Sequence, residues 1–342
     1  MNRNTILPPE FASLEGRVQY VQKKSAIEYS SSCPECGGTA HQSGEWPDRF
    51  FMRLDGKPRG WCRRCGLLWW PDGNHKQASL EDRQRWNAEE LEREYQRKRE
   101  NEESIARLQV EESWIGWHTG MGEYGRQLWQ GRGIPDIWQD FWQLGYNKDY
   151  QAKVGDSLWP TDTLTIPVFA PKSWDVIQVR HRLLQLPPNG DRYRQTWQVP
   201  PALYNADPDT PLQQVVLVEG EIKAQIGLLS AMDLFSQTPD RSIAKLYGLN
   251  FVGIPTVTPN ISLLADLKDA EEVIVCLDPD ARYITPKIKE TAEQRMVRMV
   301  KEAAPKARVR RMRLHDKVDD LILRQKLGGK WWANMLKQAV LV

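Results

Sequence analysis

Residues 214–221 read Gln-Val-Val-Leu-Val-Glu-Gly-Glu, and residues 272–280 read Glu-Val-Ile-Val-Cys-Leu-Asp-Pro-Asp. Each segment is a continuous apolar run that ends in carboxylates. Short continuous runs rich in β-branched residues are typical of strands buried on both faces, as in the parallel sheets of α/β proteins. The two segments therefore predict parallel strands in an α/β core, and this core decides the fold class.

The carboxylates that follow the two runs form the first candidate site. Ligands of parallel sheets gather at the carboxyl ends of the strands, so we expect Glu219, Asp278 and Asp280 to meet at one edge. Carboxylates at such short range repel one another unless a cation is bound, and oxygen ligands suit Mg²⁺ or Mn²⁺. A third strand-like run, residues 307–314, also precedes acidic side chains. The full candidate set for the divalent ion is Glu219, Asp278, Asp280, Asp319 and Asp320.

Two Cys-x-x-Cys pairs near the N-terminus predict a second metal site. The sequence shows no secretory signal, so the thiols are expected to be reduced, which argues against a disulfide framework. Four thiolates at this spacing suit one tetrahedral Zn²⁺ with a structural role. Residues 48–61, between the pairs, hold two strand-like runs around Asp55-Gly56 and indicate a β-hairpin. The predicted zinc ligands are Cys33, Cys36, Cys62 and Cys65.

The composition divides the 342 residues into four parts, where about 150 residues per domain would give two to three domains. Residues 1–76 are expected to form a β zinc ribbon, with an amphipathic helix over Phe11–Ile27. Residues 77–112 carry many opposite charges one helical turn apart and few apolar anchors, which predicts a solvated helical linker. We expect a basic α+β subdomain over residues 113–212, and an α/β core with C-terminal helices over residues 213–342.

The overall composition bounds the location and the partners. The sequence has no run of about 18 apolar residues, so no membrane-spanning helix and no membrane partner are expected. Without a targeting pattern at the N-terminus, we expect the protein to be cytoplasmic. Lys and Arg total 47 against 45 Asp and Glu, so the net charge alone does not indicate nucleic acid, and a basic footprint must be local.

A local basic cluster lies between Gln178 and Arg194. Alternation along a predicted strand, residues 175–183, places Arg180 and Arg182 on one face. Arg192 and Arg194 follow a Pro-Pro-Asn-Gly turn, and together the four arginines indicate a surface for phosphates. The alternative is an ordinary solvent-exposed sheet face.

In this order the motifs resemble those of the bacterial and phage TOPRIM DNA primases, especially the phage type with a four-cysteine ribbon. Residues 218–222, Val-Glu-Gly-Glu-Ile, look like the first acidic motif of the family, and residues 277–280 are similar to its Asp-x-Asp motif. Residues 317–322, Lys-Val-Asp-Asp-Leu-Ile, resemble its closing acidic stretch. Many members carry Asp four residues after the first Glu, where this chain has Lys223. The chain lacks the Gly-x4-Gly-Lys-Ser/Thr motif of a fused helicase.

The resemblance implies a DNA-directed RNA polymerase of the primase type, which serves DNA replication in a bacterial or phage-infected cell. It would make short RNA primers on single-stranded DNA from nucleoside triphosphates by two-metal-ion nucleotidyl transfer. Glu219, Asp278 and Asp280 would be catalytic, and a separate replicative helicase is a further candidate partner. Two other functions stay open: a TOPRIM nuclease, and a non-catalytic zinc-ribbon protein that binds single-stranded DNA. The expected nucleotide- or template-binding residues are Arg180, Arg182, Arg192, Arg194 and Lys223.

Overall fold

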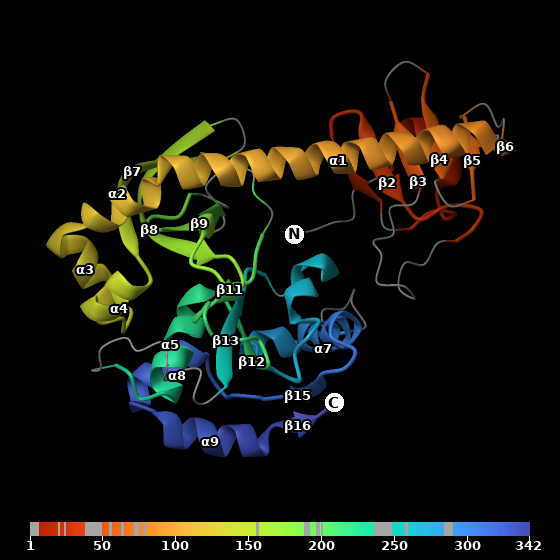
Figure 1. Ribbon diagram of the computed structural model, residues 1–342. Helices are drawn as coiled ribbons and strands as arrows, with labels where there is room; N and C mark the ends of the chain where they lie inside the picture. The colour runs from red at the N-terminus through yellow and green to blue at the C-terminus, as the bar shows by residue number, and fades with distance from the viewer. Residues whose placement is uncertain are drawn as a thin grey trace. The chain divides into compact units, whose positions relative to one another are not determined.

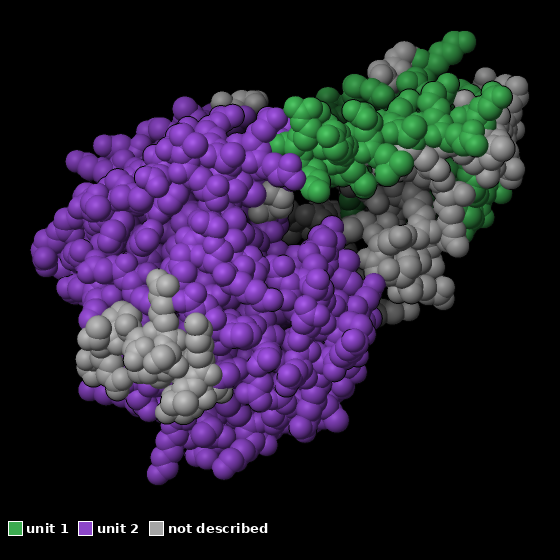
Figure 2. All heavy atoms as spheres, in the orientation of Figure 1, with its two compact units in different colours: residues 1–99 green, residues 100–342 purple. Residues whose placement is uncertain are grey.

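The computed structural model describes residues 7–19, 21–23, 25–37, 50–54, 57–62, 65–71, 75–77, 80–154, 157–187, 192–195, 199, 201–235, 248–256, 259–283 and 290–342. The chain divides into two compact units, residues 1–99 and 100–342 (Figure 1, Figure 2). The expected subdivision of the second unit at residues 212/213 stays a prediction. Among the described helices, none has both the length and the apolar character that a membrane crossing requires.

The N-terminal unit is built on one six-stranded antiparallel sheet whose strands follow chain order. Strands β3 and β4 confirm the predicted hairpin, and the rings of Phe51 and Trp61 stack across it with centroids 5.6 Å apart. The expected turn at Asp55-Gly56 lies outside the described residues. The strands are β1 (Gln22–Lys23), β2 (Glu28–Ser31), β3 (Phe50–Arg53), β4 (Arg59–Cys62), β5 (Leu67–Trp69) and β6 (His75–Gln77).

A short 3-10 helix, η1 (Pro9–Leu14), stands where a helix over Phe11–Ile27 was predicted, so that prediction is wrong beyond the first turns. Phe11 and Leu14 are fully buried, and the Phe11 ring stacks on Trp69. Val18 and Val21 pack against the same core from non-helical chain. The apolar positions are therefore buried by a short helix followed by a turn and irregular chain.

Helix α1 (Leu80–Glu111) confirms the charged helix that the sequence predicts. Its side chains form exposed ion pairs about one turn apart, such as Arg93 with Glu89 at 3.6 Å. Each such pair stabilises a helix by only about 0.5 kcal/mol. Near the end of the helix Leu108 is fully buried, in a cluster with Trp114 and Phe169.

Three short helices open the globular part of the second unit: α2 (Ser113–Thr119), α3 (Gly122–Gln130) and α4 (Asp136–Phe141). Their tryptophans are core anchors. The indole N–H of Trp138 donates to the Leu234 carbonyl at 2.8 Å, and that of Trp142 donates to the Ala206 carbonyl at 2.8 Å. Each ring is thus buried with its one polar atom paired.

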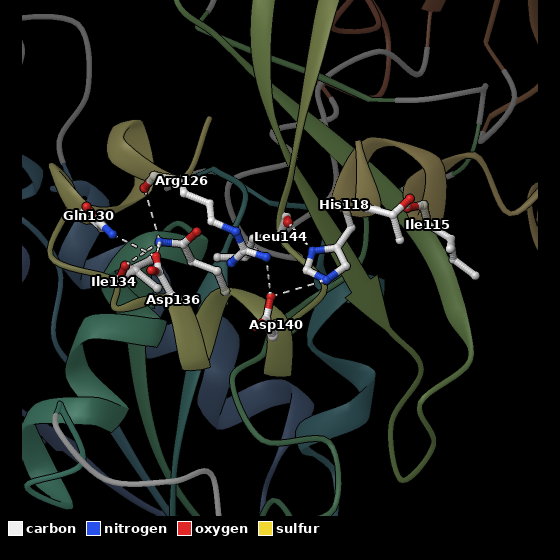
Figure 3. A network of polar contacts seen from close by, with 10 residues as sticks. Ile115, His118, Arg126, Gln130, Ile134, Asp136, Asp140 and Leu144 are labelled. Atoms are coloured by element: carbon white, nitrogen blue, oxygen red, sulfur yellow. Dashed lines mark hydrogen bonds and ion pairs between the residues drawn. The ribbon is translucent and has the colours of Figure 1, made fainter. Parts of the chain in front are cut away.

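A polar network links these helices at the surface (Figure 3). His118 Nδ1 lies 2.7 Å from the Leu144 carbonyl oxygen, and its Nε2 lies 3.5 Å from Asp140 Oδ1. Arg126 donates to the same Asp140 oxygen at 2.9 Å. Because the Asp140 side chain is 54% exposed, we expect this network to position the helices rather than to add much stability.

The second unit contains two sheets. The first is antiparallel, in the order β10-β9-β8-β7, and it confirms the strands predicted around residues 163–170 and 175–183. Its strands are β7 (Gly145–Val154), β8 (Ser157–Phe169), β9 (Val176–Leu183) and β10 (Tyr193–Gln195).

The second sheet is mixed, in the order β11-β13-β12-β14-β15-β16, and its four central strands are parallel. The two apolar runs form β12 and β14, and the third strand-like run forms β15, so the mostly parallel core is confirmed, whereas β13 was not predicted. The strands are β11 (Tyr204–Asn205), β12 (Gln214–Glu219), β13 (Leu249–Ile254), β14 (Glu272–Val275), β15 (Arg308–Arg311) and β16 (Val340–Leu341).

Both faces of the mixed sheet are covered, which explains the continuous apolar runs. Val216 and Val218 pack in the cluster that holds residues of α5 (Glu221–Ala231), α8 (Val318–Gln325) and α9 (Gly329–Gln338). Val215 and Leu217 pack in the opposite cluster, with η3 (Ile261–Leu267) and α7 (Ala292–Ala303). Because both faces of the sheet pack against apolar side chains, the charged groups of β12 and β14 lie at the strand ends.

Candidate metal centres

The four paired cysteines converge on one point in the N-terminal unit. Their sulfur atoms all lie within 4.8 Å of one another, with 3.6 Å between the sulfurs of Cys33 and Cys65 and 3.7 Å between those of Cys36 and Cys62. Gly37 and Gly66 follow the two pairs with φ of +64° and +72°, a conformation that glycine adopts without strain. Their amides donate back to the carbonyls of Cys33 and Cys62.

This geometry fits zinc. In a tetrahedral site with Zn–S bonds of about 2.3 Å, neighbouring sulfur atoms are about 3.8 Å apart, close to both separations. A hydrogen bond with the Cys62 thiol, together with burial, raises the pKa of the Cys33 thiol. Thiols crowded in this way become thiolates only when a cation compensates them. The donor set is complete with four sulfurs, as expected for a structural site.

The predicted acidic cluster, Glu219 with Asp278 and Asp280, is also present: one oxygen of each lies within 4.8 Å of the others. Glu219 ends β12, and Asp278 follows β14, the parallel neighbour of β12. The Asp278 amide donates to Glu219 Oε1 at 2.9 Å, which ties the two strand ends together.

Close backbone packing fixes the turn after Glu219. Gly220 takes a φ of +83°, and its amide donates to the Ile254 carbonyl on β13 at 2.9 Å. A Cβ on Gly253 would lie 2.5 Å from the Gly220 carbonyl oxygen, so glycine is required there. The unpredicted strand β13 therefore supports the acidic edge directly.

Burial and mutual repulsion shape the charges of the cluster. Burial, and then the charge of Asp278, raise the pKa of Glu219 to about 7. Burial also raises the pKa of Asp278, although its hydrogen bond with Lys223 opposes the shift. Carboxylates held in this way favour a bound cation, and an all-oxygen donor set suits Mg²⁺ or Mn²⁺.

The other two candidate acids lie differently. Asp319 Oδ1 is buried and has no hydrogen-bond partner among the described residues, and the Asp319 charge acts on Lys223. Asp320 is exposed, with an oxygen 3.7 Å from Arg324 on the same helix. Neither belongs to the group of oxygens within 4.8 Å of one another. Of the two, Asp319 is therefore the one whose charge acts on the acidic cluster, through Lys223.

The four arginines of the basic cluster do not share one surface. Arg180 is buried and forms an ion pair with Glu221, the first residue of α5. Arg182 is also buried, and its Nε has no hydrogen-bond partner among the described residues. Arg194 pairs across the strands with His181, which puts it on the other face of the sheet from Arg180 and Arg182. Arg192 is exposed.

Two further cations near these groups were not among the predicted site residues. Burial, followed by the charge of Arg182, lowers the pKa of Arg132, which therefore lies with this part of the basic cluster. Lys317 Nζ lies 3.9 Å from Asp278 Oδ2. Lys317 begins the acidic stretch over residues 317–322, but no spacing rule connects either cation to its partners.

A scan against models of protein families found no match, and neither did a search of curated proteins. Several solved structures with a similar fold are primases. The zinc-binding and RNA polymerase domains of the Aquifex aeolicus primase match at 14% identity with a TM-score of 0.48, over 99% of this chain and 85% of that chain. A DnaG primase catalytic domain bound to single-stranded DNA matches at 13% identity with a TM-score of 0.49, over 70% and 83%. The primase fragment of the bacteriophage T7 primase-helicase matches at 14% identity with a TM-score of 0.37, over 57% and 69%.

Proposed function

We propose that the chain is a DNA primase, which makes short RNA primers on single-stranded DNA from nucleoside triphosphates and depends on a divalent metal ion. The observation that carries the proposal is the convergence of Glu219, Asp278 and Asp280 at the carboxyl edge of a parallel sheet. The sequence motifs around the same three residues resemble those of the TOPRIM primases. The four-cysteine centre in the N-terminal unit fits the same family pattern.

The proposed reaction is attack of a ribose 3′-hydroxyl on the α-phosphate of the next nucleotide, with release of pyrophosphate. Glu219, Asp278 and Asp280 would hold the divalent ion, with Asp319 nearby. A bound ion would neutralise charge on the triphosphate and acidify the 3′-hydroxyl. The protein contributes mainly by position and charge.

Glu219 is suited to a second task. An oxygen of Glu219 lies in the same group as those of Asp278 and Asp280, so Glu219 would stand beside the ion that acidifies the 3′-hydroxyl. A general base must lie within hydrogen-bond reach of the proton that it removes. We therefore assign Glu219 as the group that assists removal of the proton from the attacking hydroxyl.

The proposed contacts with nucleic acid divide by exposure. The exposed Arg192 and the half-buried Arg194 would contact the template backbone. Arg182, whose Nε has no hydrogen-bond partner in the part of the chain that the structure describes, would contact a nucleotide phosphate. Arg180 would act on the substrate only indirectly, because Glu221 already pairs with its guanidinium. A cytoplasmic site of action and a separate helicase partner complete the proposal.

The test is RNA synthesis by the zinc-loaded chain on single-stranded DNA with labelled nucleoside triphosphates. We expect short RNA that requires Mg²⁺ or Mn²⁺, and its loss in Asp278→Asn. Asp269→Asn is the matched control, because Asp269 is an exposed acid just before the N-terminal end of β14, away from the acidic cluster. This variant should leave synthesis unchanged. Zinc content and far-UV circular dichroism check that both variants fold.

The same assay separates the alternatives. A nuclease would shorten the template without nucleotides. A binding protein would retard the template in a gel and make no product. RNA synthesis at the native rate by Asp278→Asn would refute the assignment of the acidic cluster.

A further inference from the structure

The acidic cluster already contains a cation of its own. Lys223, in the first turns of α5, places its Nζ 2.6 Å from Asp278 Oδ2. The two side chains are only 14% and 6% exposed, so this ion pair is largely removed from water. Surface ion pairs are weak, but breaking a shielded pair is costly because it leaves a buried charge without its partner.

The backbone fixes the position of Lys223. The helix begins directly after the turn at Gly220, where the Ala224 amide donates to the Gly220 carbonyl. Glu221, two residues before Lys223, is buried in its ion pair with Arg180, and Ile222 is buried in the core. Lys223 is therefore held at the cluster by packing on the residues around it.

The charge balance of the cluster points to one divalent ion. When Glu219, Asp278 and Asp280 are all ionised, as ligands of a cation are, these three carboxylates and the single ammonium of Lys223 leave a net charge of −2. Lys317 and Asp319 lie next to this group and cancel each other. A second divalent ion at the cluster would lie near the Lys223 ammonium, which contacts Asp278 Oδ2, and would meet the repulsion of its positive charge.

We propose that the Lys223 ammonium takes the place of one divalent cation, so that the cluster binds a single Mg²⁺ or Mn²⁺ before nucleotide arrives. The resemblance implies two metal ions at this site. In this chain one metal ion and the Lys223 ammonium would fill the two cation positions. The inference rests on the divalent-cation site of the proposed function, but it does not require RNA synthesis. Lys223 is thus a residue that sets the metal stoichiometry.

The experiment is a titration of the full, zinc-loaded chain with Mn²⁺ in the absence of DNA and nucleotide, with free Mn²⁺ followed by electron paramagnetic resonance. Zn²⁺ retains the thiolate site because soft sulfur ligands disfavour Mn²⁺. We expect one Mn²⁺ in the wild type and two in Lys223→Met, with the first bound at least about tenfold more tightly in that variant. Lys223→Arg, which keeps the charge, should bind one.

Further variants locate the ion and protect the test. Asp280→Asn should lose the Mn²⁺ of the wild type, which assigns the ion to the cluster. Lys223→Gln repeats the experiment if Lys223→Met does not fold, as judged by zinc content and circular dichroism.

Each outcome decides the inference. Two Mn²⁺ at the cluster of the wild type, or one Mn²⁺ of unchanged affinity in both neutral variants, would overturn it. No Mn²⁺ in the wild type would overturn both this inference and the metal site of the proposed function. One Mn²⁺ in the wild type and two in Lys223→Met, without any RNA synthesis, would support the inference while the proposed function fails.

Discussion

Arg180→Met should destabilise the second unit strongly, because it breaks a buried ion pair. Arg180 on β9 pairs with Glu221 on α5, and each side chain is 3% exposed. Arg180 also donates to Gln178 at 2.9 Å and to the Ala202 carbonyl. The pair therefore connects the antiparallel sheet with the helix that follows Glu219. The variant leaves a carboxylate buried without its partner.

The expected loss is about 3–5 kcal/mol in the free energy of unfolding, the usual cost of removing one partner of a buried pair. With a urea m value of about 3 kcal/mol/M, a loss of about 4 kcal/mol lowers the midpoint by about 1.3 M. The double variant Arg180→Met/Glu221→Leu removes both charges and should recover most of this loss. The two residues should thus show a coupling energy of about 3 kcal/mol.

The assay is equilibrium unfolding in urea, followed by tryptophan fluorescence. Trp129, Trp138 and Trp142 are buried in the second unit and report on its unfolding. Zinc release follows the N-terminal unit separately, since a chain of two units need not unfold in one step. Arg192→Met is the matched control, because this arginine is exposed and its loss should cost less than about 0.5 kcal/mol.

A loss below about 1 kcal/mol in Arg180→Met would refute the reasoning, and so would simple additivity in the double variant. Either result would mean that the guanidinium is not committed to Glu221. Arg180 would then be free to bind phosphate, as the sequence alone suggested.

Two further predictions concern zinc and pH. Cys62→Ser should abolish stoichiometric zinc binding and unfold the N-terminal unit, whereas Cys276→Ala, at a buried thiol outside the cluster, should keep one zinc per chain. A metal-binding dye measures the zinc content of both variants. Full zinc retention in Cys62→Ser would contradict the assignment. Burial lowers the pKa of His181 to about 3. The unfolded chain therefore takes up a proton below about pH 6.5 while the folded chain does not. His181 alone should thus lower the free energy of unfolding by about 2 kcal/mol between pH 7 and pH 5. The raised pKa of Glu219 acts in the opposite direction, so the measured quantity is the difference between wild type and His181→Gln in urea unfolding at the two pH values. An unchanged difference would show that His181 is not buried in its neutral form.

The acidic edge could be predicted because its causes are local. Two apolar runs end in carboxylates, and parallel neighbours must bring those ends together, so Glu219 and Asp278 meet as expected. The cysteine centre follows similarly from the spacing of its pairs. In both cases the residues that set the geometry lie next to those that carry the chemistry.

Strand β13 could not be predicted, because Asn250 and Gly253 interrupt its apolar pattern. Both are explained only by tertiary contacts. The Asn250 amide donates to the carbonyls of Asp207 and Thr210, and Gly253 makes room for the backbone of Gly220. Polar and small residues in a central strand are signs of specific partners, which a pattern of hydrophobicity does not contain.

The burial of Arg180 and its ion pair with Glu221 could not be predicted for the same reason. Alternation correctly put it on one face of β9 with Arg182, but it could not show that this face is buried. Its partner, Glu221, belongs to a motif that draws attention to metal binding. The pairing of the two depends on how the two sheets of the unit pack, which the sequence pattern does not record.

The core of the second unit has a consequence for how the chain folds as it is made. Trp332 of α9 is buried in the same cluster as Trp129 and Trp138, and its indole donates to Ser230 at 3.1 Å. Contacts so distant in sequence form slowly and close late. A nascent chain on the ribosome would therefore expose part of this apolar core until α9 has emerged, and during that interval it would be prone to aggregation.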